Sequence, residues 1–80
     1  MTVSSPQGLT ARAILANNLL RLRRERKWSQ EDLALEADLH RTFVAHVERQ
    51  VRNISVDNIE KLANALGVQT FELLRPHRRS

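Results

Sequence analysis

The sequence contains no cysteine, which excludes a disulfide framework and thiolate metal sites. Its absence is consistent with a reducing compartment. Long apolar runs are also missing, and the longest apolar stretches are far too short to cross a bilayer. Residues 1–8 lack the basic and apolar regions of a secretory signal peptide. We therefore expect a cytoplasmic protein that does not enter a membrane.

The short length also argues against catalysis. An active site needs a nucleophile, a base and an orienting group in a pocket, and 80 residues leave little room for one. His40, His46 and His77 have no carboxylate and no second histidine four residues further on. A chain of this length suits one domain, without a second domain for sensing a ligand. We expect no enzyme, and no metal, cofactor or small-molecule ligand.

The charge balance is basic. Thirteen Lys and Arg residues face nine Asp and Glu residues, which gives a net charge of +4. Eleven of the basic residues are Arg, whose planar guanidinium suits phosphate groups and base edges. This excess favours nucleic acid as a partner only weakly, because an ordinary soluble surface can carry the same charge. The positions of the charges along the predicted helices must distinguish a nucleic-acid surface from an ordinary soluble one.

Apolar residues recur at helical spacing along most of the chain, with no strand signal and no internal repeat. They predict an all-α domain at 10–75, between a flexible tail at 1–9 and a basic tail at 76–80. Helices are expected at about 10–27, 29–38, 40–50, 55–66 and 70–75. The expected N-caps are Ser29 with Asp32, Ser55 and Thr70, and Gly67 is the expected C-terminal stop of the fourth helix. The fourth helix is expected to bury Val56, Ile59, Leu62, Ala63 and Leu66.

The second and third predicted helices form a distinctive pair. Ala34 and Ala37 are small and allow the third helix to approach closely, after a tight break at Asp38 and Leu39. Two short helices joined by a tight turn, the second with a polar outer face, make up a helix-turn-helix. Any small helical bundle could show a similar pattern, so the arrangement alone does not establish DNA binding.

The outer face of the third helix carries no acidic residue. Thr42, Ala45, His46 and Arg49 share that face, and Arg41 lies beside it on the first turn. Arg41 can bind the O6 and N7 atoms of guanine, and the Ala45 methyl can contact a thymine methyl. Thr42 and His46 can bond base edges or phosphates. An ordinary solvated helix usually pairs Glu with Lys, so this face favours DNA over a random basic surface.

The inner face of the same helix contains one charge. Glu48 points inward with Val44 and Val47, where an unpaired carboxylate would be costly to bury. Arg23 lies on the inner side of the first helix and is the expected partner. The alternative is that both side chains reach solvent separately.

Several segments together resemble the Cro and lambda/434-repressor type of helix-turn-helix, also called the xenobiotic-response-element family. The similar segments are Leu22-Arg23, Trp28-Ser29-Gln30-Glu31-Asp32-Leu33-Ala34, Val47-Glu48-Arg49, Arg52-Asn53-Ile54-Ser55 and Leu62-Ala63-Asn64-Ala65-Leu66-Gly67-Val68. Within that family the chain is most similar to the controller proteins of restriction–modification systems, through Arg41-Thr42-Phe43 and the segments that follow it. The chain departs from the family at Asp38 and Gln50, where Gly is usual, and at His40, where a Ser, Thr or Asp cap is common.

The resemblance implies a transcription regulator with a lambda-repressor-like fold of five helices. Its partners would be a second copy and a palindromic site on double-stranded DNA, with RNA polymerase as a candidate further partner. Residues at matching positions imply base reading by Arg41, Thr42, Ala45 and His46, and phosphate contacts by Gln30, Arg49 and Arg52. The resemblance also implies a buried ion pair at Arg23 and Glu48.

The last two helices are the expected dimer interface. Phe71 lies two residues from Leu73, so a helix turns it away from the core, and Val68 and Leu74 would surround it. The alternative is that Phe71 folds back over those two residues as a lid. A protein-binding module such as an antitoxin is the competing function. It would be expected to expose apolar residues on the third helix, where this chain is polar and basic.

Overall fold

The computed structural model describes residues 9–77, and the described part is helical without a strand. Its helices are α1 (Ala11–Glu25), α2 (Gln30–Ala37), α3 (Arg41–Glu48), α4 (Val56–Leu66) and α5 (Thr70–Leu73). The prediction of an all-α domain with five helices is confirmed. The predicted tails fall largely outside the described residues. No helix between residues 9 and 77 has the length and apolarity that crossing a membrane requires.

Local caps explain where the helices begin. Thr10 accepts a hydrogen bond from the Ala13 N–H at 3.1 Å, and Ser29 forms the predicted reciprocal capping pair with Asp32. The Ser55 hydroxyl accepts the Asn58 N–H at 3.1 Å, as predicted. These side chains satisfy N–H groups that a helix start leaves without partners.

Two of the predicted boundary details are wrong. Gln69, not Thr70, is the N-cap of α5, because the Glu72 carboxylate three residues later accepts the Gln69 N–H at 2.9 Å. Val56 is 74% exposed and does not join the core. It is the first residue of α4, at the edge of the bundle, whereas the other four predicted positions of that helix are buried.

The turns depend on left-handed backbone conformations. Asp38 ends α2 at φ 58°, and Gln50 takes φ 64° after α3. Both positions therefore have the conformation that glycine would favour, and the expected turn at Asp38 is confirmed. Gly67 ends α4 at φ 71°, as predicted.

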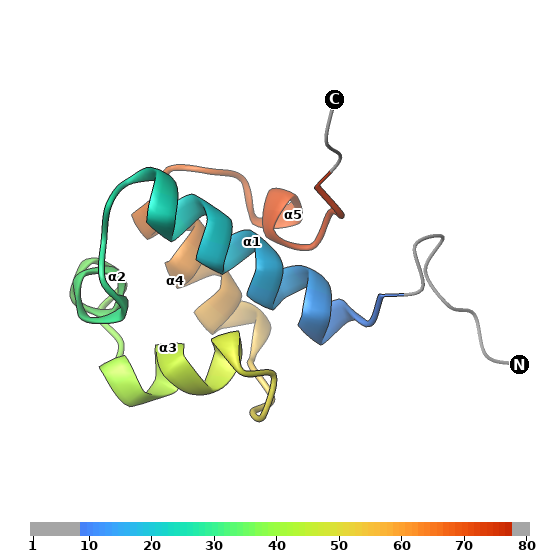
Figure 1. The fold of residues 1–80 in the computed structure, drawn as a ribbon, viewed down its shortest axis with the longest axis horizontal. Helices are drawn as coiled ribbons and strands as arrows, with labels where there is room; N and C mark the ends of the chain where they lie inside the picture. Colours follow the sequence, from blue (N-terminus) through green and yellow to red (C-terminus); the bar gives the residue numbers. More distant parts are fainter. Residues whose placement is uncertain (1–8, 78–80) are drawn as a thin grey trace, which may run out of the picture.

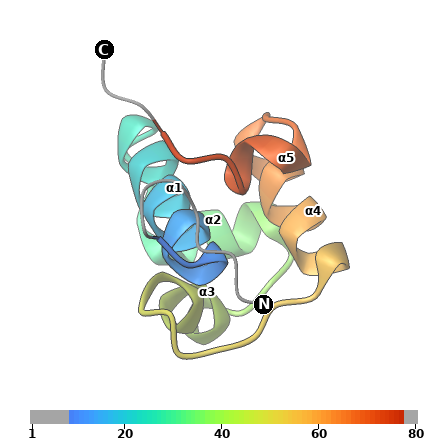
Figure 2. The ribbon, with the colours of Figure 1, turned by 90° about the vertical axis from the view of Figure 1, so that its right-hand side faces the viewer.

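The core is aliphatic and is supplied by every helix. Its largest fully buried apolar side chains come from all five helices and are Leu19, Leu33, Val44, Leu62, Leu66 and Leu73. α1 packs against α3 and α5, while α4 packs against α2 and α5. Figure 1 shows α1 running across the molecule with α3 below it, and Figure 2 shows α3 at the bottom of the molecule and α5 at its upper right. The packing therefore leaves one long side of α3 free.

Candidate nucleic-acid interface

The α2–turn–α3 unit is built on small buried side chains. Ala34 and Ala37 of α2 are buried, and α3 packs directly against that helix. The Leu39 N–H donates to the Ala34 carbonyl at 2.8 Å, which closes the turn. His40 precedes α3 and makes no side-chain capping bond. The orientation of α3 is therefore set by packing and by the turn rather than by its own N-cap.

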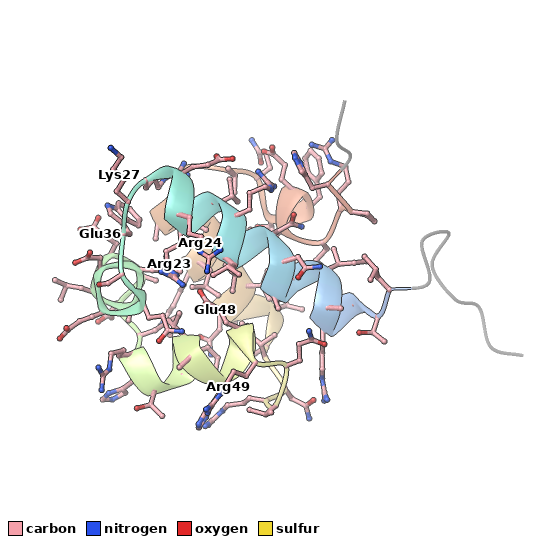
Figure 3. All side chains as sticks on the ribbon, in the orientation of Figure 1. Arg23, Arg24, Lys27, Glu36, Glu48 and Arg49 are labelled. Atoms are coloured by element: carbon pink, nitrogen blue, oxygen red, sulfur yellow. The ribbon has the colours of Figure 1, made fainter. Side chains whose placement is uncertain are left out.

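The two faces of α3 differ sharply. Val44 and Val47 are buried, whereas Arg41, Thr42 and Arg49 are exposed. Ala45 and His46 are half-buried on the solvent side. The structure thus brings the predicted base-reading residues and Arg49 to one open surface. In Figure 3, Arg49 points away from the domain while Glu48 points back toward α1.

Glu48 is held by a network that spans three segments. Its carboxylate accepts the Arg23 Nε–H at 2.8 Å and an Arg23 Nη2–H at 3.0 Å, and the two side chains are only 7% and 13% exposed. Arg23 Nη1 also donates to the Trp28 carbonyl at 2.9 Å. The predicted pairing is present, and the two charges do not reach solvent separately. The network fixes α3 to α1 (Figure 3).

Gln30 has a structural contact that sequence reasoning missed. Its Nε2 donates to Glu48 Oε1 at 3.0 Å. A side-chain amide carries two N–H groups, so one donor remains for another acceptor. Gln30 opens α2 and is half-buried. Its predicted phosphate contact therefore needs only the remaining N–H.

The loop after α3 gathers additional cations. Arg52 is exposed, and its guanidinium lies 5.3 Å from the centre of the Phe43 ring. This cation–π contact restricts a side chain that would otherwise sample many rotamers. Arg12, at the start of α1, bonds the Asn53 side chain in the same loop. Neither contact was predicted, because a loop path carries no periodic signal.

The predicted dimer surface is largely open. Phe71 is 61% exposed and Leu74 is 42% exposed, while Val68 is half-buried. The Arg75 guanidinium lies 5.7 Å from the centre of the Phe71 ring. Phe71 therefore does not fold away as a lid, and Leu73 alone of this segment is fully buried.

An apolar groove of about 330 Å³ adjoins Leu74. Its lining comes from the start of α1, the loop before α4 and α4 itself, including Leu15, Ile54 and Ile59. Elsewhere, Leu35 on α2 is 78% exposed, an apolar position that no prediction used. No group of three or more metal-binding side chains is found among residues 9–77.

The sequence profile of a family described as Helix-turn-helix, HTH_3, matches residues 19–73. The crystal structure of a hypothetical transcription factor, NHTF from Neisseria, has a TM-score of 0.83 at 45% identity and covers 95% of this chain and 85% of that chain. The restriction-modification controller protein C.AhdI from Aeromonas hydrophila has a TM-score of 0.74 at 42% identity, over 78% of this chain and 94% of that chain. A third similar structure is the controller protein C.Esp1396I as a tetramer in complex with its natural 35 base-pair operator. Its TM-score is 0.74 at 29% identity, over 82% of this chain and 91% of that chain.

Proposed function

The chain belongs to the helix-turn-helix family HTH_3, and we propose that it is a sequence-specific DNA-binding transcription regulator that places α3 in the major groove. The observation that carries this proposal is the outer face of α3, which is open, basic and without a carboxylate. The single acid of that helix, Glu48, is turned inward and neutralised by Arg23. The face can therefore approach the DNA polyanion without repulsion.

The roles of the α3 side chains follow from their chemistry. Arg41 is at the first turn, and its guanidinium matches the O6 and N7 acceptors of guanine. Thr42 and His46 can donate to or accept from neighbouring base edges. Ala45 has no side chain beyond its methyl group, so it permits close approach and can contact a thymine methyl.

Phosphate contacts come from residues around the rim of this face. Arg49 and Arg52 are exposed cations after α3, and Arg52 is already restricted by the Phe43 ring. Gln30 adds an amide donor from the first residue of α2, near the positive end of that helix. Such contacts fix the register of the protein on the duplex without reading its sequence.

We propose that the regulator acts as a homodimer through Val68, Phe71 and Leu74. Large exposed apolar side chains on a small domain are typical of an interface. A two-fold dimer would present two α3 helices about 34 Å apart, one turn of DNA, and so would read a palindromic operator. The similarity to controller proteins over most of the chain supports a role of that type.

The cellular setting follows from this activity. A regulator that binds an operator works where the DNA is, so we propose a cytoplasmic location and RNA polymerase as a further partner. We propose no catalytic activity. The competing antitoxin-like function gains no support from α3, because an apolar binding face is not present on that helix.

Selection of bound sites from random double-stranded DNA tests the proposal. We expect enrichment of palindromes whose half-site centres lie about 10–10.5 base pairs, or a multiple of that spacing, apart. A selection that yields no common sequence, at a salt concentration where the protein still binds DNA, would contradict sequence-specific regulation.

A further inference from the structure

Asn18 is the most deeply buried polar residue in the described part of the chain, with 1% exposure. It lies in the middle of α1, and no role suggested by the DNA-binding face involves it. Its Nδ2 donates to the carbonyls of Leu73 at 2.8 Å, Arg75 at 2.9 Å and Glu72 at 3.2 Å. Its Oδ1 accepts from Arg21 at 3.1 Å, which orients the amide. One side chain therefore binds two carbonyls at the C-terminal end of α5 and one just beyond it.

The segment that Asn18 holds is short. α5 has four residues, too few for a helix to be stable by itself. The carbonyls at a helix C-terminus have no partners within the helix. Leu73 anchors the segment in the core, where α5 also packs against α4 and α1. The two N–H groups of the Asn18 amide, shared among three carbonyls, add a directional constraint on the rotation of α5.

The rotation of α5 decides where its exposed apolar side chains point. Phe71 of α5 and Leu74, the residue that follows the helix, are three residues apart and exposed, whereas Leu73 between them is buried. A change in the rotation of the segment would move both side chains together. Because these are two residues of the proposed dimer interface, the dimer geometry depends on the carbonyls that Asn18 binds.

α1, which carries Asn18, also holds α3 in place. Arg23 follows Asn18 by five residues on α1 and holds Glu48 of α3. α1 accordingly contacts both α3 and α5, on opposite sides of the molecule in Figure 1. We propose that Asn18 is a positioning residue that sets the dimer surface relative to α3, and through it the half-site spacing that the dimer accepts. This inference rests on the proposed homodimer.

A matched pair of variants tests the proposal. Asn18→Asp replaces an amide nitrogen with an oxygen that cannot donate, at almost unchanged size, and it places negative charge against three carbonyls. Asn17→Asp makes the same substitution at the exposed neighbouring residue of α1. Sedimentation of the full chain should show a dimer dissociation constant raised roughly tenfold or more for Asn18→Asp, since buried carbonyls lose their donor. Asn17→Asp should sediment as the wild type does.

Two further readouts separate positioning from general stability. Hydrogen exchange should accelerate in residues 69–75 of Asn18→Asp, while the amides of α1 to α4 stay protected. Operators with half-sites moved by one base pair should lose affinity for the wild type but much less for this variant. Asn18→Ala removes the donor without adding charge. It should also weaken the dimer, accelerate exchange in residues 69–75 and relax the preference for half-site spacing.

The outcomes are distinguishable. A monomeric wild type would overturn the proposed homodimer itself. A dimeric wild type with an equally tight Asn18→Asp dimer and unchanged spacing preference would overturn the role of Asn18. Loss of protection throughout α1 to α4 in both Asn18 variants would also overturn it, because the side chain would then hold the whole fold rather than α5.

Discussion

Arg41 lies exposed on the first turn of α3, where its guanidinium can align with the edge of a base pair. A bidentate contact to guanine discriminates by about 1–3 kcal/mol. We expect Arg41→Ala to weaken binding to the selected operator by that amount and to relax the preference at one G·C pair in each half-site. Site selection with the variant measures this effect. Arg24→Ala, which removes an exposed arginine from α1, is the control, and an unchanged base preference in Arg41→Ala would exclude Arg41 from base reading.

Arg23 and Glu48 neutralise each other at the junction of α1 and α3. Removing either partner leaves the other charge largely buried, a change that costs about 3–5 kcal/mol. We therefore expect Arg23→Ala and Glu48→Ala to lower the free energy of unfolding by that order, and the double variant to lose far less than the sum. Denaturant unfolding of all three variants gives the coupling. Losses below about 1 kcal/mol that simply add would contradict a buried pair.

Some side-chain contacts can be predicted from a sequence and others cannot. Arg23 and Glu48 could be paired in advance because each lies in a periodic helix whose inner face is identifiable. The Gln30–Glu48 bond depends on how α2 and α3 cross, and the Arg52–Phe43 contact depends on a loop path. Asn18 binds backbone carbonyls 54–57 residues away. Every residue has such a carbonyl whatever its side chain, so the residue types in the sequence do not identify these partners.

Apolar periodicity and capping residues predict the helices well, but they predict the exact first residues of the helices less well. Ser29 and Ser55 were predicted because capping acts within four residues of chain. Gln69 was missed because Thr70 is the stronger capping residue by type, and only the Glu72 contact shows that the helix begins one residue earlier. Val56 fits the apolar stripe of α4, but it is the first residue of that helix and is exposed.

The exposed aromatic side chain of α5 leads to a prediction about dimerisation. Phe71→Ala and Phe71→Glu should remain folded, because Phe71 is 61% exposed, and should become monomeric at concentrations where the wild type is dimeric. Loss of the dimer should also abolish tight operator binding, since one half-site offers only half of the contacts. Sedimentation and operator binding of each variant measure both effects.

Leu35→Glu is the matched control for Phe71→Glu. Leu35 is an apolar residue of α2 with 78% exposure, so the substitution adds the same charge at another open apolar position. This variant should stay dimeric. Phe71 variants that remain dimeric, or a Leu35 variant that is equally monomeric, would contradict an interface centred on α5.

The whole molecule carries a net charge of +4, and the proposed contact surface concentrates part of it at the end of α3. Binding should therefore weaken steeply with salt as condensed counterions are released from the DNA. Arg49→Gln should weaken specific and non-specific binding alike and reduce the slope of log affinity against log salt by about one per contact. Lys27→Gln, at the top of Figure 3 and opposite Arg49, is the control with the same charge change. An affinity independent of salt would contradict phosphate contacts.

If α3 reads base edges from the major groove, methylation of those edges on the selected operator should interfere with binding. Dimethyl sulfate methylates guanine at N7 in the major groove and adenine at N3 in the minor groove, so a single experiment distinguishes the two grooves. We predict that N7 methylation of one guanine in each half-site blocks binding of the wild type and no longer matters for Arg41→Ala. Interference confined to adenine N3, or a guanine signal that persists unchanged in Arg41→Ala, would contradict the proposed reading surface.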